Sequence, residues 1–203
     1  MPSAAADSSF VSFLGGWNSL MGLSTPAHHV RIARWLERVF KSRKRRGLLL
    51  AFRASGKSTI VGLFIGWLLR EDPNLRILVV AADSVLAKKM VRSARRIIEM
   101  HPGLAVIRPV RRVEWAGGCF TVERGMPLRD PSVLAMGIGA NITGSRADVI
   151  VCDDVEVPKN TSTAARRAEL REKLLELDFV LTPDGMEVFI GTPHVKDTIY
   201  RVR

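Results

Sequence analysis

Residues 47–58 decide the fold, and they read Gly-Leu-Leu-Leu-Ala-Phe-Arg-Ala-Ser-Gly-Lys-Ser. The run Gly47–Phe52 is apolar throughout and has the length of a strand that is buried on both faces. Residues Gly56–Leu69 follow it with the composition of a buried helix. The sequence therefore predicts a strand, a tight loop and a helix in direct succession.

The loop between this strand and this helix is typical of a phosphate-binding site. The usual signature is GxxxxGK[ST] directly after a strand, and here Ala51 replaces the first glycine. In such loops backbone N–H groups surround the β-phosphate, the lysine neutralises the β- and γ-phosphates, and the hydroxyl binds Mg²⁺. The alternative is an ordinary turn with an exposed lysine. We expect nucleotide contacts from Arg53, Ala54, Ser55, Gly56, Lys57, Ser58 and Thr59, with Ser58 also a metal ligand.

Strands and helices alternate along the rest of the chain. This pattern predicts an α/β fold with a mostly parallel central sheet flanked by helices. Short β-prone pieces around Val113–Trp115 and Cys119–Val122 indicate a hairpin. The remaining expected elements are a helix from Thr25-Pro26, a strand at Arg76–Ala82, a helix from Asp83 or Ser84 to Met100, strands at Val133–Gly137 and Val149–Cys152, a helix at Ser162–Phe179 and a strand at Glu187–Ile190.

The strand Val149–Cys152 ends in acidic residues. In an open α/β sheet, ligands bind beyond the carboxyl ends of the strands. Asp153 would then hold Mg²⁺, and a neighbouring carboxylate would polarise the attacking water. Asp154 has the usual register for that second role and Glu156 has the usual side-chain length, with register favouring Asp154. The alternative is a solvated strand end that carries three acids.

Composition narrows the class of protein. The chain has 203 residues, of which 47% are hydrophobic and 25% charged, ordinary values for one globular domain. Its net charge of +11 favours a polyanionic partner, nucleic acid before acidic membrane. Two cysteines provide neither a disulfide framework nor a zinc cluster. The apolar stretch Ile60–Leu69 is too short to cross a bilayer, and no secretory signal is evident, so we expect an unexported protein.

The first 24 residues differ from the remainder. Met1–Ser24 is rich in Ser, Ala and Gly, and it contains no Lys or Arg. We expect a loosely ordered N-terminal arm over residues 1–24. Apolar residues at helix-like spacing leave a short docking helix as an alternative; they are Phe10, Phe13, Trp17 and Leu20.

Four segments together resemble the ATPase domain of phage terminase large subunits, in particular the DNA maturases of short-tailed phages. They are Arg53–Ser58, Ile142–Asp148, Asp153–Pro158 and Gly191–Pro193, and they occur in the order of that family. The resemblance covers residues 25–203 and implies a P-loop NTPase of the ASCE type that uses ATP and Mg²⁺. It also implies double-stranded DNA, a homo-oligomeric ring, the portal or procapsid and a small terminase subunit as partners, in the host cytoplasm without a membrane.

The resemblance also implies roles for single residues. Arg53 corresponds to a loop arginine that senses the γ-phosphate, and Gly191, Thr192 and Pro193 correspond to a motif that couples hydrolysis to DNA movement. Related motors place a trans-acting arginine beside the glycine equivalent to Gly144, where this chain has Thr143. The nearest arginine, Arg146, is the candidate, on a segment expected to end near the γ-phosphate edge of the sheet. Its alternative is a salt bridge to Asp148 or Asp153.

Two further expectations concern the nucleobase and DNA. An adenine-contacting motif belongs near Thr25–His29, with His28 or His29 as a base contact or simply as a helix-start histidine. The basic runs Lys41–Arg46 and Lys88–Arg96 are candidate DNA contacts or solvated helix faces.

Other functions stay open at this point. The nuclease domain usual in the family is absent from this chain, which suggests an excised domain or a nuclease on a separate chain. A helicase or another P-loop NTPase is the enzymatic alternative, and a catalytically degenerate DNA-binding prophage remnant is the non-enzymatic one.

Overall fold

The computed structural model describes residues 9–110, 115–142, 144–192 and 198–201. A six-stranded sheet has the order β1-β6-β5-β2-β4-β3. All neighbouring strands are parallel except β3, which runs antiparallel to β4. The predicted α/β class with a mostly parallel sheet is therefore confirmed. The strands are β1 (Arg46–Leu50), β2 (Ile77–Ala81), β3 (Cys119–Phe120), β4 (Val133–Gly137), β5 (Ala147–Asp153) and β6 (Leu181–Gly191).

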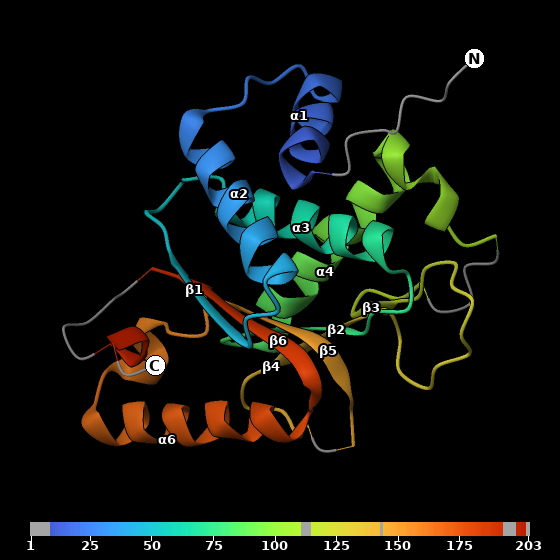
Figure 1. Ribbon diagram of the computed structural model, residues 1–203. Coiled ribbons are helices and arrows are strands. Elements are labelled where there is room, and N and C mark those ends of the chain that lie inside the picture. Colours follow the sequence, from blue (N-terminus) through green and yellow to red (C-terminus); the bar gives the residue numbers. More distant parts are fainter. Residues whose placement is uncertain (1–8, 111–114, 143, 193–197, 202–203) are drawn as a thin grey trace, which may run out of the picture.

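Helices cover both faces of this sheet, as Figure 1 shows. One face carries α1 (Phe10–Leu20), α2 (Ala27–Lys41), α3 (Lys57–Glu71) and α4 (Ser84–Met100), and the opposite face carries α6 (Ala164–Leu175). Each face has its own hydrophobic cluster, and the larger one lies under the four N-terminal helices. The short helices are α5 (Pro158–Thr161), η1 (Pro102–Ile107), η2 (Glu176–Phe179) and η3 (Ile199–Arg201).

Helix α3 is the centre of the larger cluster. Every residue from Ile60 to Leu69 is buried, as its continuous apolar sequence predicts. Gly62 lets α4 approach closely, because a β-carbon there would lie 2.9 Å from the Ile97 Cδ1 atom. None of the described helices is long and apolar enough to cross a membrane.

Helix α1 corrects the expectation of a loosely ordered arm over residues 1–24, at least from Phe10 onward. Phe10 is fully buried, with its ring 5.4 Å from that of Phe64 and 5.5 Å from that of Trp67. The Ser9 hydroxyl caps the helix by accepting from the Ser12 N–H. The alternative of a short docking helix is the one observed, because its apolar side completes the core over α3.

The predicted hairpin falls partly on residues 111–114, outside the described residues. What the structure shows of it is an antiparallel bridge between Trp115 and Phe120 and the two-residue strand β3. Asp83 caps α4 as expected, since its carboxylate accepts from the Leu86 N–H at 2.9 Å.

Candidate functional site

Three chain segments meet at one edge of the sheet because their strands run parallel. Leu50 of β1 is in register with Gly191 of β6, and Asp153 of β5 is in register with Ile190. The loop after β1, the acidic end of β5 and the segment after β6 therefore leave the sheet side by side. This edge is where ligands bind in open α/β sheets.

The loop between β1 and α3 has the backbone of an anion cradle. Ala54 and Gly56 both have positive φ, at 60° and 76°, and Gly56 is the N-cap residue of α3. The first bond of the helix runs from the Ile60 N–H to the Gly56 carbonyl. The amides of residues 56–59 therefore have no partner within the helix and can face an anion.

Alanine at position 51 fits this loop. The Ala51 N–H donates to the Gly191 carbonyl at 3.1 Å, which extends the pairing of β1 with β6 by one residue. Its φ lies outside the positive range that favours glycine. The departure from the usual signature therefore leaves the loop geometry intact.

Lys57 points away from the helix toward the acidic strand end. Its ammonium nitrogen lies 2.6 Å from Asp154 Oδ1 and 3.2 Å from Thr192 Oγ1. The Thr192 hydroxyl in turn donates to the Ala51 carbonyl at 2.9 Å. Asp154 itself has a φ of 46°, a conformation that Asp tolerates better than most residues. One lysine thus connects all three segments of the site.

Asp153 carries a buried carboxylate whose surroundings suit a cation. Its Oδ1 atom is buried and, within the described part of the chain, has no hydrogen-bond partner. Burial, with a smaller contribution from the Asp154 charge and an opposing one from Lys57, raises the pKa of Asp153 to about 7. A divalent cation beside it would satisfy the orphaned oxygen and favour the charged form. Ser58 lines the same cavity with a hydroxyl group, and one carboxylate plus phosphate oxygens suits Mg²⁺.

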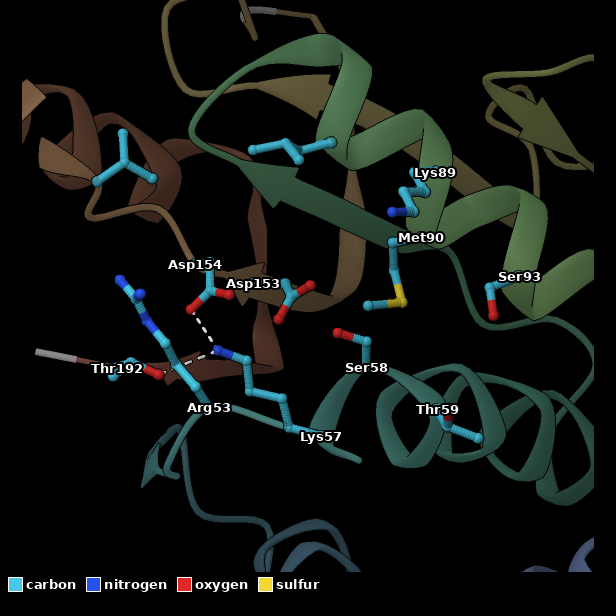
Figure 2. A pocket seen from close by; sticks show the side chains of 12 residues that line it. Arg53, Lys57, Ser58, Thr59, Lys89, Met90, Ser93, Asp153, Asp154 and Thr192 are labelled. Atoms are coloured by element: carbon cyan, nitrogen blue, oxygen red, sulfur yellow. Dashed lines mark hydrogen bonds and ion pairs between the residues drawn. The ribbon is translucent and has the colours of Figure 1, made fainter. Parts of the chain in front are cut away.

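These groups surround a cavity of about 410 Å³, shown in Figure 2. Arg53 extends on the side of Asp154 and Thr192, while Lys89 enters from the opposite wall. That wall belongs to α4, and its place beside the loop depends on a strand order that the linear sequence does not reveal. The lining residues are Arg53, Lys57, Ser58, Thr59, Leu86, Lys89, Met90, Ser93, Asp153, Asp154, Val157 and Thr192.

Glu156 lies outside this cavity. Its side chain is fully buried, and its Oε2 atom accepts from the Thr198 hydroxyl at 2.7 Å and from the Ile199 N–H at 2.9 Å. Of the two acids that competed for the water-polarising role, the structure brings only Asp154 beside Lys57. Glu156 instead holds residues 198–199 by hydrogen bonds, and Ile199 belongs to the smaller hydrophobic cluster.

Arg146 lies at the far end of β5 from the cavity, which corrects the expected place of its segment. It directly precedes Ala147, whereas Asp153 ends the same strand seven residues later. At about 3.3 Å per residue the two ends are roughly 20 Å apart. The salt-bridge alternative is not observed, because Asp148 is paired with Arg76 at 2.9 Å and Arg146 is exposed. Thr143 and Pro193 are outside the described residues.

The two histidines at the start of α2 contact the loop backbone. Both Nε2 atoms face the Ser55 carbonyl, at 3.3 Å from His28 and 2.9 Å from His29. A carbonyl oxygen only accepts hydrogen bonds, so each Nε2 carries a proton. Sequence reasoning offered these residues as a base contact or as helix-start histidines, and the structure places both in the first turn of α2. Their contact with the loop was not predicted, and the chain carries no local signal for it.

The two basic runs differ in how their charges are used. In Lys41–Arg46, Lys41 pairs with Glu37 at 2.6 Å, and Arg46 pairs with Asp178 at 2.7 Å and Glu187 at 3.1 Å. On α4, Arg95 donates to the carbonyls of Trp115 and Ala116. Lys88 and Arg92 of the same helix are exposed. Arg43 and Lys44 of the first run are exposed as well, so both runs carry exposed cations.

Comparison with known proteins gives one clear sequence relative. The terminase large subunit of enterobacteria phage T3 is 36% identical over 156 residues, which are 76% of this chain and 27% of that protein. The chain thus spans about a quarter of the length of this relative. No protein-family model matches the chain.

Solved structures show the same fold at low identity. The large terminase of bacteriophage HK97 superposes with a TM-score of 0.54 at 12% identity, over 83% of this chain and 33% of that one. Yeast Dbp5, in a complex with Nup159, Gle1, IP6 and ADP, also gives a TM-score of 0.54 at 12% identity, over 91% of this chain and 46% of that one. These likenesses support the P-loop NTPase fold.

Proposed function

The chain is a relative of the phage terminase large subunits, and from that premise we propose that it is the ATP-hydrolysing motor domain of a DNA-packaging terminase. One observation carries the proposal: an ion pair between Lys57 and Asp154 at the mouth of an anion cradle, beside the orphaned carboxylate of Asp153.

Nucleotide binding would use the loop from Arg53 to Thr59. The free amides at the start of α3 would bind phosphate oxygens, and the Lys57 ammonium would neutralise the β- and γ-phosphates. Ser58 and Asp153 would hold Mg²⁺, which offsets phosphate charge when bound. Arg53 would contact the γ-phosphate from the side of the cavity on which Asp154 lies.

Hydrolysis would depend on a change of partner for Lys57. The ammonium lies 2.6 Å from Asp154 Oδ1. A γ-phosphate would attract Lys57, which would leave the Asp154 carboxylate free to accept a proton from water. Turnover would then begin only once the polyphosphate is in place.

Coupling to movement would start at Thr192. Its hydroxyl contacts the Lys57 ammonium, and the residues that follow lead to the segment held by Glu156. Movement of the Lys57 ammonium would therefore alter its contact with Thr192 first, within the proposed coupling motif of Gly191, Thr192 and Pro193. Arg146 is roughly 20 Å from its own cavity, so we propose that it acts in the cavity of a neighbouring subunit in a ring.

The substrate to be moved would be double-stranded DNA, bound through its phosphates by the exposed cations of α4. Such contacts follow the duplex without reading its sequence. The proposed assembly is a homo-oligomeric ring that works with the portal of the procapsid and a small terminase subunit in the host cytoplasm.

The test is ATP turnover by the purified chain, with and without duplex DNA. We expect Mg²⁺-dependent turnover that Lys57→Ala abolishes and that Lys173→Ala leaves unchanged, since Lys173 is on α6 and does not line the cavity. Duplex movement without strand separation would distinguish a packaging motor from a helicase. Turnover that survives Lys57→Ala in a folded protein would refute the site, and a folded wild type without turnover would favour a degenerate remnant.

A further inference from the structure

The contact between α2 and the phosphate loop suggests a role for His29. Its Nε2–H donates to the Ser55 carbonyl at 2.9 Å, and the ring lies against Gly56. A β-carbon at Gly56 would be 2.6 Å from that nitrogen. The backbone of the loop and the ring of His29 are therefore in direct contact.

The orientation of this carbonyl determines where the next amide points. Ser55 C=O and Gly56 N–H belong to one peptide group, which is planar and trans, so the two bonds point in opposite directions. His29 draws the carbonyl toward α2. The Gly56 N–H is thereby aimed away from α2, as the first of the free amides at the start of α3.

This peptide group needs an external restraint. Ala54 and Gly56 flank Ser55 and both have positive φ, and glycine populates positive and negative φ about equally. The Ser55–Gly56 peptide can therefore rotate at little cost unless its carbonyl is held. Such a rotation would turn the Gly56 N–H out of the cradle and present a carbonyl oxygen to the phosphate.

Helix α2 is a rigid base for the restraint. Its residues Ala33, Leu36 and Val39 are buried, and the aromatic ring of Trp35 and the Val39 methyl lie close to Gly47 of β1. His28 reinforces the contact, since its Nε2 is 3.3 Å from the same carbonyl and its ring lies edge-on to His29 at 4.5 Å.

We propose that His29 is a positioning residue that locks the Ser55–Gly56 peptide with its amide toward the phosphate of a bound nucleotide. The proposal rests on the proposed function only in taking that ligand to be a nucleotide. It gives His29 a function through the loop backbone in place of a contact with the base.

Mg²⁺-ADP binding measured by calorimetry tests this role, because ADP carries the β-phosphate and its binding needs no turnover. We expect His29→Ala to weaken ADP binding about tenfold, and His29→Gln, which keeps a side-chain N–H donor, to restore it to within about threefold. His28→Ala should have a smaller effect. Arg34→Ala, an exposed change on the same helix, should bind as the wild type does.

Two further readouts separate positioning from general stability. In His29→Ala, KM for ATP should rise in parallel with the dissociation constant for ADP while kcat stays within about twofold, since the amide contacts phosphate before and during the reaction. The unfolding midpoint without nucleotide should be the same for His29→Ala and His29→Gln. Wild-type affinity in His29→Ala, or equal loss in both variants with a lowered midpoint, would overturn the proposal.

The outcome also separates this proposal from the proposed function. A wild type that binds ADP but turns over no ATP would refute the motor, and the His29 variants would still decide the positioning role through ADP. A wild type that binds no ADP would refute both.

Discussion

Lys57 Nζ and Asp154 Oδ1 lie 2.6 Å apart across the mouth of the cavity, so the lysine proposed to bind phosphate is paired with the acid proposed to polarise water. Lys57 begins α3 after the loop that follows β1, and Asp154 directly follows β5. The parallel registers of β1, β6 and β5 bring them together. This contact fixes the orientation of the Asp154 carboxylate. On binding of a polyphosphate, Lys57 would exchange its contact with Asp154 for one with a phosphate oxygen.

Asp154→Asn should therefore abolish turnover while sparing nucleotide binding. Loss of a general base costs about 10²- to 10⁴-fold in rate. Removing the carboxylate also removes the competitor for Lys57, so affinity for Mg²⁺-ATP should be unchanged or greater. Single-turnover hydrolysis and equilibrium binding on the same protein measure the two effects.

Glu156→Gln is the matched control for that experiment. An amide oxygen at this position can still accept from the Thr198 hydroxyl and the Ile199 N–H, so turnover should stay within several-fold of the wild type. Loss of turnover in Glu156→Gln, with activity retained in Asp154→Asn, would reverse the assignment of the two acids.

His101 predicts a loss of stability in mild acid. Its Nδ1 accepts from the Gly103 N–H and its Nε2–H donates to the Phe13 carbonyl, both at 3.0 Å, so the buried ring is neutral. Burial lowers the pKa of His101, and the charges of Arg70 and Arg108 lower it further against the opposing effect of the Phe13 carbonyl. Unfolded histidine takes up its proton near pH 6.5, whereas the folded ring resists it. This contribution to stability is full above that pH and is lost as the pH falls toward the folded pKa.

Urea unfolding of the wild type and His101→Gln between pH 7 and pH 5 measures this effect. The free energy of unfolding of the wild type should fall more steeply, by up to about 1.4 kcal/mol per pH unit. Equal slopes in the two proteins would show that His101 does not titrate differently on folding.

Local sequence signals predicted the parts of the site that lie within one continuous stretch. The loop at Gly56-Lys57-Ser58 and the two acids after Cys152 each follow a strand, as expected. The expectation that the first strand is buried on both faces is wrong, because β1 is an edge strand of the sheet and Leu48 and Leu50 are exposed. Strand β6 shows the limit of such signals. It begins at Leu181, six residues before the predicted Glu187, because Leu181 pairs with Ala147 of β5, and residues 182–185 form an irregularity before regular pairing resumes at Met186.

The remaining errors concern contacts between distant segments. Burial of α1 depends on the rings of Phe64 and Trp67, and the role of Glu156 depends on residues more than forty positions away. The histidine contact with Ser55 is of the same kind. The direction of β5 alone places Arg146 at the opposite end of the strand from the acids. The predicted strand, which ends at those acids, already implied this position.

DNA binding should be steeply dependent on salt and indifferent to sequence. A protein that neutralises six or more phosphates loses about 10³-fold or more in affinity between about 50 and 200 mM salt. Arg92→Gln should lower the slope of log affinity against log salt by about one, since Arg92 is exposed on α4. Lys173→Gln, the same charge change on the opposite face of the sheet, should leave the slope unchanged. A flat salt response, or strong preference for one short site, would contradict a backbone-tracking interface.

Arg146 should act across a subunit boundary, because β5 separates it from its own cavity by roughly 20 Å. An arginine supplied in trans is worth about 10³-fold or more in rate. Arg146→Ala should therefore bind nucleotide normally as a monomer and lose the rate increase that assembly brings. Mixing Arg146→Ala with Lys57→Ala chains decides the matter, since mixed rings contain interfaces with an intact Lys57 on one side and an intact Arg146 on the other. Recovered ATPase activity supports action in trans. Rings that assemble from both variants and recover nothing would leave Arg146 without a role in the reaction.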